Sequence, residues 1–392
     1  MQIFNILFWV LLGIVVYAYV GYAIILALIS FFVNSKPKAP QVTVNYQPEV
    51  TLVIAAYNEC DLVEQKVKNG FAQTYPASKI QQLWITDGST DGSERILKDF
   101  GSVKVLHSPQ RHGKTAAINR AMPYVNTPIT ILTDANTMLS ENAVECMVEI
   151  FSDTTVGCVA GEKRIKIKDR DNAVTSGEGI YWQYESLIKS LESKANSTLS
   201  AAGELYAIRT ELFNPVPASI ILDDFVISTQ IAKAGHKVKY CPQAYAVEAA
   251  SASIEEEKKR KIRIAAGAYQ AMYLYPWLFN LFSYPLLSFQ FISHKVLRWV
   301  LVPLAIIIAP MAALMAYVLT PQSMLNLVLA VISLAFVTLV GVGWVAREEK
   351  VGFKFIFLPY YLYVMNITMI RGFFRFIAGK QDVRWEKAKR VK

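Results

Sequence analysis

The chain has 392 residues, of which 53% are hydrophobic, 12% aromatic and 18% charged. Soluble domains carry about 25% charged residues, and this excess of bulky apolar residues excludes disorder, collagen and coiled coil. The net charge of +9 comes from basic residues beside apolar segments: Lys36, Lys38, Lys258–Arg263 and the tail from Lys380 to Lys392. This placement is typical of membrane surfaces that contact anionic lipid, and the pattern predicts no nucleic-acid partner.

The apolar residues concentrate at the two ends of the chain. Residues 1–35 predict a transmembrane anchor, because Ile3 to Val33 contains no charge and exceeds the roughly twenty residues that a spanning helix needs. No basic start precedes this run, which favours an uncleaved anchor over a signal peptide. The basic residues that follow the anchor predict that the next domain lies in the cytosol and that the protein is integral to a membrane. The membrane that we expect is a bacterial plasma (inner) membrane.

Residues 296–378 predict C-terminal transmembrane helices. Two spans are clear, Val300–Leu319 and Leu325–Ala346, and a third apolar run, Phe353–Ile370, fits either a crossing or a helix that lies in the interface. Residues 268–295 are rich in aromatic side chains and contain prolines, which predicts interfacial amphipathic helices. Residues 379–392 form a basic tail.

The middle of the chain, residues 36–267, alternates apolar β-rich runs with helix-like stretches. The expected strands are Val50–Ala55, Leu83–Thr86, Val103–Leu106, Ile129–Leu132 and Val156–Ala160. The expected helices are Asp61–Phe71, Gly92–Phe100, Thr115–Met122 and Glu141–Phe151. This alternation predicts an α/β domain with a Rossmann-like, mostly parallel sheet that is covered on both faces.

Polar residues follow four of the expected strands. These sets are Ala56–Glu59, Asp87–Ser93, Arg111–Lys114 and Asp134–Asn136. The carboxyl ends of parallel strands meet at one edge of a sheet, where α/β proteins bind ligands. The four sets are therefore expected to converge on one ligand.

Two nucleotide-binding motifs are excluded by spacing. No G-x-G-x-x-G follows a strand, which argues against an ordinary dinucleotide fold. His112–Thr115 resembles the end of a phosphate loop, but Ser108 stands where the first glycine is required and Pro109 follows it, so a backbone cradle is disfavoured. Lys114 remains a candidate for a single charge near a diphosphate.

Asp134 and Asn136 place a carboxylate and an amide oxygen two residues apart at a strand end. Hard cations such as Mg²⁺ take oxygen ligands of this kind together with substrate phosphates. Most D-x-N triplets are turns or caps, but the position opposite the Asp87 loop favours a metal site. Asp87 itself either accepts a hydrogen bond from a nucleoside or is the first residue of an Asp-Gly turn.

Asp223 and Asp224 precede an apolar helix. Two acids at a helix N-terminus fit capping, and equally fit a general base that takes a proton from an attacking hydroxyl. Arg260 and Arg263 share one face of a later helix. They fit neutralisation of a diphosphate, contact with the membrane surface, or both.

Together these motifs resemble those of the membrane-embedded family-two glycosyltransferases, which include cellulose, hyaluronan, chitin and poly-N-acetylglucosamine synthases. The match extends from about residue 50 to residue 275. The residues that carry it are Ala55–Glu59, Asp87–Ser93, Gly113–Thr115 with Asn119, Thr133–Asn136, Gly203–Tyr206 and Leu222–Phe225. Ser293–Lys295 and Trp385 in the apolar and basic C-terminal segments also resemble that group.

The resemblance implies a GT-A fold, a nucleotide-sugar donor that is usually UDP-linked, and Mg²⁺ or Mn²⁺ as cofactor. It implies that Ala56, Tyr57, Glu59 and Asp87 contact the nucleoside, that Lys114 lies near the nucleotide, and that Asp134 and Asn136 hold the metal and diphosphate. Asp224 would be the general base, next to Asp223. The implied reaction is a single displacement with inversion, with a glycan or lipid-linked acceptor. Gly203, Glu204, Tyr206 and Trp182 would line the acceptor path, unless they serve only packing.

The chain departs from the family pattern in two places. Asn136 replaces the second acid of the D-x-D motif found in many members. Where processive synthases have Q-x-x-R-W after the base, Arg260 and Ile264 replace the glutamine and tryptophan, while Arg263 matches. Because of these departures, transfer to a lipid-linked or short-glycan acceptor is as well supported by the sequence as processive synthesis of a polymer. A catalytically silent membrane scaffold with the same fold is the alternative, and the retained acids favour the enzyme. Nothing in the pattern indicates an oligomeric state.

Overall fold

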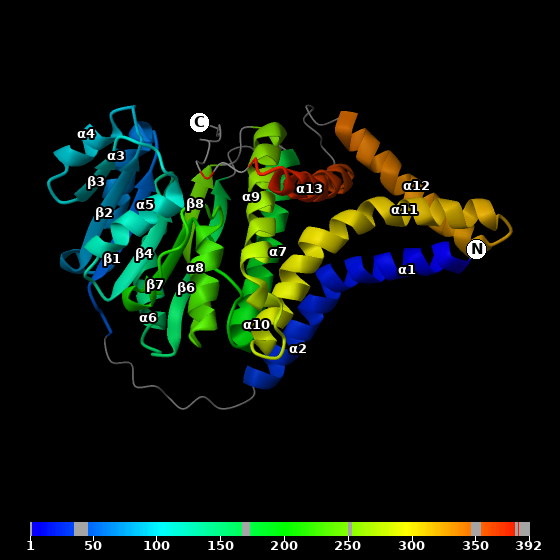
Figure 1. Ribbon diagram of the computed structural model, residues 1–392, viewed down its shortest axis with the longest axis horizontal. Coiled ribbons are helices and arrows are strands. Elements are labelled where there is room, and N and C mark those ends of the chain that lie inside the picture. The colour runs from blue at the N-terminus through cyan, green and yellow to red at the C-terminus, as the bar shows by residue number, and fades with distance from the viewer. Residues whose placement is uncertain are drawn as a thin grey trace. The chain divides into compact units, whose positions relative to one another are not determined.

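The computed structural model describes residues 2–34, 46–166, 173–249, 253–345, 354–380 and 383 (Figure 1). The chain divides into two compact units. The sheet unit comprises Leu28–Lys166, Trp182–Ala250 and Asp382–Lys392, and the helical unit comprises Met1–Ala27, Ile167–Tyr181 and Ser251–Gln381. The domain boundaries that we derive from the sequence stay predictions.

One mixed sheet of eight strands forms the centre of the sheet unit in the described part of the chain. Its strands are β1 Val50–Ala56, β2 Ile80–Asp87, β3 Lys104–Ser108, β4 Ile129–Asp134, β5 Thr137–Leu139, β6 Val156–Lys166, β7 Leu205–Arg209 and β8 Lys237–Ala249. The spatial order is β3-β2-β1-β4-β7-β6-β8-β5. Neighbours from β3 to β4 are parallel, as are β6 and β8, whereas β7 runs antiparallel to both β4 and β6 and β5 runs antiparallel to β8.

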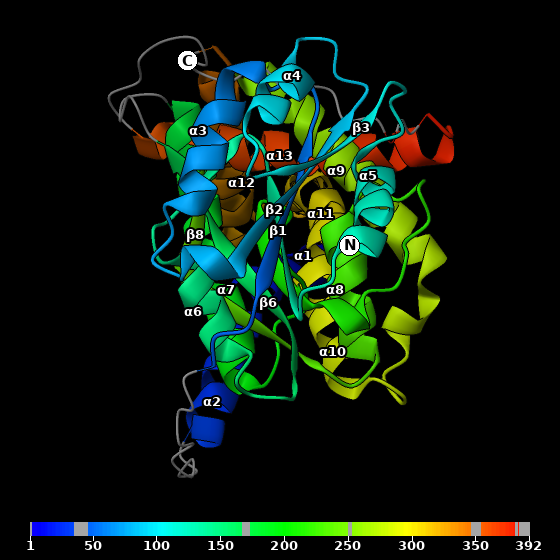
Figure 2. The same ribbon diagram turned by 90° about the vertical axis from the view of Figure 1, so that its left-hand side faces the viewer.

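Helices cover both faces of this sheet. They are α3 Cys60–Phe71, α4 Ser93–Asp99, α5 Lys114–Ala121, α6 Ala143–Ile150, α8 Asp223–Lys233 and the second half of α7 Ala173–Ala195, with short 3-10 turns at Ala77–Lys79, Met122–Tyr124 and Thr210–Leu212. Figure 2 shows α3 and α6 on one side of the central strands and α5 and α8 on the other. Coverage on both sides explains why every residue of β1 is buried.

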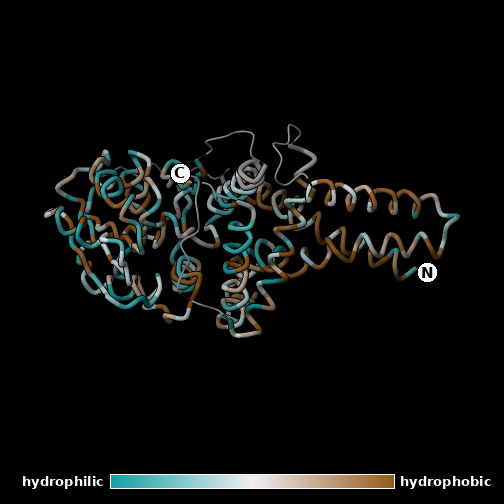
Figure 3. Tube along the Cα trace, turned by 90° about the horizontal axis from the view of Figure 1, so that it is seen from above, coloured by the Kyte–Doolittle hydropathy of each residue, from teal (hydrophilic) through white to brown (hydrophobic). Residues whose placement is uncertain are grey.

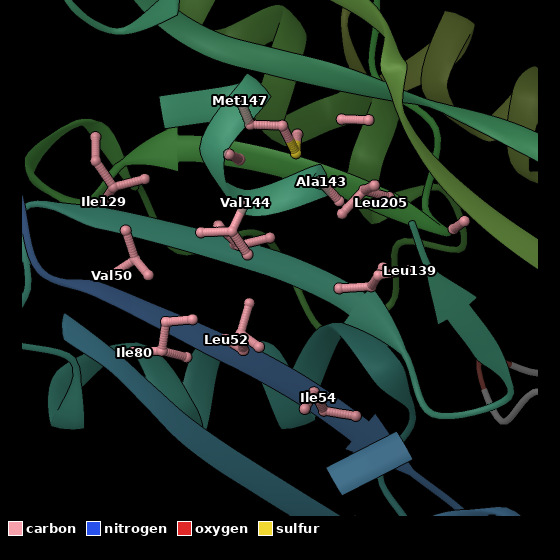
Figure 4. Packing of buried hydrophobic residues seen from close by; sticks show 14 of the residues in the cluster. Val50, Leu52, Ile54, Ile80, Ile129, Leu139, Ala143, Val144, Met147 and Leu205 are labelled. Carbon is pink, nitrogen blue, oxygen red and sulfur yellow. The ribbon is translucent and has the colours of Figure 1, made fainter. Parts of the chain in front are cut away.

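The main core of the sheet unit lies between the strands and α3, α4 and α6. Alternate residues of β1, namely Val50, Leu52 and Ile54, belong to this core together with Val144 and Met147 of α6 (Figure 4). This period of two is the pattern expected for one face of a strand. The core fixes the strands, so their carboxyl ends are held in register: Asp134 of β4 lies beside Ala55 of β1, and Asp87 of β2 lies beside Ser108 of β3.

The predicted Rossmann-like fold is confirmed, with a more mixed sheet than the sequence indicated. Each of the five predicted strands is present within a few residues, and each predicted helix between them is present. The sequence did not indicate β5, β7 or β8. Because β7 enters antiparallel between β4 and β6, only the first four strands and the β6–β8 pair form parallel ladders.

Three helices among the described residues are long and apolar enough to cross a membrane. They belong to the helical unit, except that Leu28–Val33 is assigned to the sheet unit. They are Gln2–Val33, Pro285–Leu319 and Met324–Val345, and Figure 3 shows the long hydrophobic stretch that begins at the N-terminus. By element they comprise α1 Gln2–Val16, a π-helical turn Tyr17–Gly21 and α2 Tyr22–Asn34; then α10 Pro285–Gln290, π-helical Phe291–Leu301 and α11 Val302–Leu319; and α12 Met324–Val345. These helices indicate an integral membrane protein.

The helical unit also contains the first part of α7, Ala173–Tyr181, and two further helices. α9 spans Ile254–Leu274 and packs against α13, Lys354–Ile377. Gly372 of α13 permits the close approach, because a Cβ there would lie 2.3 Å from the Cβ of Ala265. The aromatic-rich segment predicted to be interfacial contains the end of α9, a 3-10 turn at Pro276–Phe279 and α10. Ala346 and Phe353, at the ends of two predicted spans, lie outside the described residues.

Candidate active site

The loops after β1 and β2 are joined by hydrogen bonds at the carboxyl edge of the sheet. Asn58 adopts the left-handed conformation (φ 53°), which asparagine tolerates better than most residues. Its side-chain oxygen accepts the Thr90 amide at 2.8 Å, and the Cys60 amide donates to Asp91 at 2.8 Å. These bonds hold Tyr57 and buried Glu59 beside the loop that follows Asp87.

Asp87 is fully buried at the end of β2 and organises the loop that follows β3. Its Oδ2 accepts the backbone amides of His112 (3.0 Å) and Gly113 (2.7 Å). Its Oδ1 lies 3.7 Å from an Arg120 guanidinium nitrogen but has no hydrogen-bond partner among the described residues. A buried acceptor of this kind needs an explanation, and a ligand group is one.

Arg111 lies over the ring of Tyr57, with its guanidinium carbon 3.5 Å from the ring centroid. Stacking of this kind is favourable for arginine. The sequence indicates Arg111 only as part of a polar loop, because a contact between residues 54 positions apart gives no local signal. The pair lies beside the start of the loop that follows Asp87, because a Cβ at Gly88 would lie 2.7 Å from the Cβ of Arg111.

Lys114, the first residue of α5, contacts both the end of β4 and the segment that precedes β7. Its ammonium lies 2.5 Å from Asp134 Oδ1 and donates to the Gly203 carbonyl oxygen at 3.1 Å. Desolvation alone would lower the pKa of Lys114, but Asp134, Asp223 and Asp224 together raise it above its ordinary value. Lys114 is therefore a fixed positive charge among three acids.

Asp223 and Asp224 open α8, and hydrogen bonds hold this helix start close to Lys114. Thr115 donates to the carbonyl oxygen of Ile220, and Asn119 exchanges two hydrogen bonds with Val216. On the other side, the Ala201 amide donates to Ser228 of α8. As a result, a Cβ at Gly203 would lie 3.3 Å from the Lys114 ammonium and 3.4 Å from Asp224 Oδ2.

The two acids differ in environment. Burial and the neighbouring charge of Asp223 raise the pKa of Asp224 to about 7, against the lowering effect of Lys114. Asp223 is 4% exposed, and its Oδ2 has no hydrogen-bond partner in the described part of the chain. The hydroxyl of Tyr206, fully buried nearby on β7, also lacks one. Such unsatisfied polar atoms are expected where a polar substrate binds.

The predicted metal ligands stand at the end of β4. Desolvation and Glu204 raise the pKa of Asp134, against Lys114. Asp134 and Asn136 are partly exposed, and the described residues contain no group of three His, Cys, Asp or Glu side chains that could hold a metal ion. This donor set fits a hard cation that takes one carboxylate and an amide oxygen from the protein and the remaining ligands from phosphate and water.

Two buried lysines make polar contacts with residues next to Asp134 and Gly203. Lys66 is fully buried in α3 and donates to Thr133 Oγ1 (3.0 Å) and to the Thr137 carbonyl oxygen (2.7 Å), which lie on either side of Asp134 and Asn136. Burial lowers the pKa of Lys66 to about 7, although Asp134 opposes the shift. Lys163 lies 2.5 Å from both Glu204 and Glu248. Single buried lysines of this kind have no recognisable sequence signal.

Residues 48–267 match the glycosyltransferase-like family 2. The chain belongs to this family. It is a glycosyltransferase, and the groups gathered around Lys114 lie within the matched residues.

Two kinds of bacterial enzyme are related in sequence. The poly-β-1,6-N-acetyl-D-glucosamine synthase of Staphylococcus aureus strain MSSA476 is 25% identical over 286 residues, covering 69% of this chain and 67% of that protein. The O-antigen chain rhamnosyltransferase RfbN of Salmonella typhimurium is 22% identical over 222 residues, covering 54% of this chain and 70% of RfbN. This chain is thus homologous to polysaccharide synthases.

A solved structure shares the fold over most of the chain. The mannosyltransferase PcManGT from Pyrobaculum calidifontis, in complex with GDP-Man and Mn²⁺, superimposes with a TM-score of 0.69 and 21% identity. The match covers 95% of this chain and 99% of PcManGT. It confirms the predicted GT-A fold.

Not every predicted site residue belongs to the sheet unit. Arg260 and Arg263 lie on α9 of the helical unit. Arg260 donates two hydrogen bonds of 3.0 Å to buried Glu257 one turn earlier. Contact of these arginines with a diphosphate stays a prediction. Trp182 lies in the sheet unit, and the Lys163 ammonium is 5.0 Å from its ring centroid.

The C-terminal tail contributes one described residue near the loop that follows β3. A Cβ at Gly113 (φ 97°) would lie 2.9 Å from the carbonyl oxygen of Val383. Val383 is the centre of Gln381–Trp385, which spells Q-x-x-R-W, the pattern that residues 260–264 match only at Arg263. Trp385 lies outside the described residues. Val383 therefore lies against the loop that follows β3, within the sheet unit.

Proposed function

We propose that the protein is an inverting, metal-dependent transferase that moves a sugar from a UDP-sugar to a glycan or lipid-linked acceptor, in polysaccharide or glycolipid biosynthesis. The observation that carries this proposal is the arrangement of Lys114 between Asp134 and Asp224. It puts a cation-binding acid, a fixed positive charge and an acid with a pKa of about 7 around one point of the sheet edge.

The donor side of the site is the edge formed by the loops after β1, β2 and β3. Tyr57 and Arg111 would contact the base, with Glu59 on the same loop as Tyr57. Ala56 is fully buried in the main core, so it would contribute backbone atoms only. Asp87 Oδ1 is a buried acceptor suited to a ring N–H or a ribose hydroxyl. Lys114 provides the positive charge that a diphosphate requires, with Arg260 and Arg263 as further candidates.

Asp134 and Asn136 would hold Mg²⁺ or Mn²⁺. When bound, such an ion neutralises the charge that develops on the leaving diphosphate. Lys114 lies against the same carboxylate, so its ammonium is placed to share the diphosphate charge. Lys66 and the two threonines that it contacts keep the loop carrying both ligands in position.

Asp224 would be the general base. A carboxylate with a pKa near 7 is half deprotonated at neutral pH and can accept the proton of the acceptor hydroxyl. The hydroxyl oxygen attacks the anomeric carbon from the side opposite the diphosphate, the bond to the diphosphate oxygen breaks, and the configuration inverts. Gly203, Glu204, Tyr206 and Trp182 would form the acceptor side, because Gly203 has no side chain between Lys114 and Asp224.

The reaction would take place on the cytosolic face of a bacterial plasma membrane. The three apolar helices and the basic residues beside them support this orientation. Nucleotide sugars are made in the cytosol, so a site facing that side has direct access to its donor. The names of the staphylococcal relatives make N-acetylglucosamine the first donor sugar to test.

The test is turnover of a panel of nucleotide sugars in native membranes and in purified protein, with Mg²⁺, Mn²⁺ or chelator, followed by mass analysis of the product. The proposal predicts nucleotide release from at least one UDP-sugar, loss of release with chelator and a glycosylated product. If no donor releases nucleotide in the presence of any acceptor, the proposed enzymatic function is wrong and the hypothesis of a catalytically silent scaffold is favoured.

A further inference from the structure

Lys66 of α3 is a buried lysine whose hydrogen-bond partners carry no charge. Its ammonium donates to Thr133 Oγ1 at 3.0 Å, to the Thr137 carbonyl oxygen at 2.7 Å and to Thr137 Oγ1 at 3.4 Å. The side chain is fully buried, and lysine is almost never fully buried unless it is paired. The three acceptors match the three N–H groups of an ammonium, so this residue has a specific polar role rather than a packing role alone.

The ammonium fixes the direction of both threonine hydroxyl groups. A hydroxyl has a single hydrogen, and each of the two oxygens accepts from Lys66. Each hydroxyl therefore donates elsewhere: Thr133 to the carbonyl oxygen of Glu204 at 2.9 Å, and Thr137 to the carbonyl oxygen of Asp134 at 3.0 Å. Lys66 thus acts on two backbone carbonyl groups to which it makes no hydrogen bond of its own.

These two carbonyl groups belong to the two sides of the candidate active site. The bond from Thr137 closes the cation turn, Asp134–Thr137, which carries the proposed cation ligands. The bond from Thr133 holds the acceptor turn, Gly203–Glu204, where the Gly203 carbonyl oxygen also accepts from Lys114 at 3.1 Å. One buried ammonium therefore connects the donor side of the site to the acceptor side.

Without this ammonium the two hydroxyl groups would have another arrangement available. Thr133 Oγ1 and Thr137 Oγ1 lie 3.2 Å apart, within reach of a hydrogen bond to each other. Because each hydroxyl has one hydrogen, a bond between them would release the carbonyl group of either Glu204 or Asp134. Donation from Lys66 to both oxygens keeps both hydrogens on the carbonyl groups.

We propose that Lys66 is a positioning residue that fixes the cation turn and the acceptor turn relative to each other. It acts through Thr137 on the cation turn and through Thr133 on the acceptor turn. Loss of a group that orients metal ligands in this way typically lowers metal affinity or activity by about 10- to 100-fold. The inference rests on the proposed function and adds to it one residue that sets the geometry of both sides of the site.

Two measurements on the purified full chain test this inference without any need for turnover. The first is hydrogen–deuterium exchange of the cation turn and of the acceptor turn. The second is the affinity for Mn²⁺ in the presence of UDP, followed by the electron paramagnetic resonance signal of free Mn²⁺ and corrected with a protein-free UDP series. The variants are Lys66→Met, Thr133→Val and Thr137→Val. Lys68→Met is the matched control, because Lys68 is an exposed lysine on the same helix that pairs with Glu64.

The four variants should give different patterns. Lys66→Met should exchange faster in both turns and bind Mn²⁺ about 10- to 100-fold more weakly than the wild type. Thr137→Val should change the cation turn and the Mn²⁺ affinity only. Thr133→Val should change the acceptor turn only, with a Mn²⁺ affinity close to that of the wild type. Lys68→Met should match the wild type in both measurements.

The opposite results are equally distinct. Faster exchange spread evenly over the sheet unit in Lys66→Met, or an unchanged Mn²⁺ affinity in that variant, would overturn the inference. The same exchange pattern in Thr133→Val and Thr137→Val would also overturn it, because a merely structural loss does not separate the two turns. Donor turnover is measured separately: if the wild type turns over no donor, the proposed function is wrong, and the link between the two turns is still judged by exchange and Mn²⁺ binding.

Discussion

The ammonium of Lys114 lies 2.5 Å from the carboxylate of Asp134, although one residue begins α5 and the other ends β4. Both side chains are partly buried, at 20% and 29% exposure. The ion pair therefore puts two of the predicted donor-binding groups at one point. Removing either partner leaves the other charge without its nearest counterpart.

Lys114→Met is expected to lower kcat/KM for the donor by about 100-fold or more, because one fixed charge near the diphosphate is lost. Steady-state nucleotide release across donor concentrations measures the effect. Lys104→Met, at an exposed position on β3, serves as the matched control and should retain wild-type values. Equal kcat/KM in Lys114→Met and the wild type would remove Lys114 from the site.

Asp224→Asn is expected to lower kcat by about 100- to 10,000-fold, the range associated with loss of a general base. Donor affinity, followed by binding of a fluorescent nucleotide, should change little because the base acts on the acceptor. Asp223→Asn tests which acid is the base. If Asp223→Asn abolishes turnover and Asp224→Asn does not, the two roles are exchanged.

The rate should depend on pH through Asp224, whose pKa is raised to about 7. The base acts only when deprotonated, so kcat/KM should rise tenfold per pH unit below about pH 7 and level off above it. A pH–rate profile between pH 5 and 9, in buffers of constant ionic strength, measures this. A profile that is flat through pH 7 contradicts the assignment.

The same shift affects stability. Because the folded pKa of Asp224 lies above the ordinary value of 3.8, the folded state binds this proton more tightly, and the resulting stability is lost as pH rises toward about 7. Asp224→Asn removes a buried charge at high pH, so it should raise Tm at pH 8 more than at pH 5. Thermal unfolding of both proteins in the same detergent tests this; a lower Tm at pH 8 would contradict it.

Gly113→Ala should weaken nucleotide binding and lower Tm. The glycine has a φ of 97°, and a Cβ would lie 2.9 Å from the Val383 carbonyl oxygen, so the substitution strains the loop and displaces the tail. Gly101→Ala is the control, because a Cβ there meets nothing within 4 Å. Identical nucleotide affinity in the two variants would show that the contact with Val383 is unimportant.

The sequence predicted the first half of the sheet well because its signals are local. Strands such as Val50–Ala56 are continuous apolar runs bounded by polar loops, and parallel order follows from strand–helix alternation. The polar residues after these strands were predicted to converge, and the structure brings Lys114, Asp134 and Asp224 together. Short β7 gives no comparable signal: its five residues alone do not indicate that it inserts antiparallel between β4 and β6.

Other features depend on distant contacts. Lys66 and Lys163 look like surface residues in the sequence, and only the fold shows that they are buried against the loop of Asp134 and against Glu204. Asp87 was expected either to contact a nucleoside or to begin a turn; one of its oxygens accepts hydrogen bonds from the loop after β3, and the other has no hydrogen-bond partner among the described residues. The stacking of Arg111 on Tyr57 is likewise a property of loop geometry.

A cryo-EM map of the full chain with UDP and Mn²⁺ tests the central claim most directly. The account predicts the uracil beside Tyr57 and Asp87, the cation bound to Asp134, and the diphosphate within contact of Lys114 and facing Asp224. Nucleotide density on another surface, with Asp134 and Asp224 free of both nucleotide and cation, would contradict it.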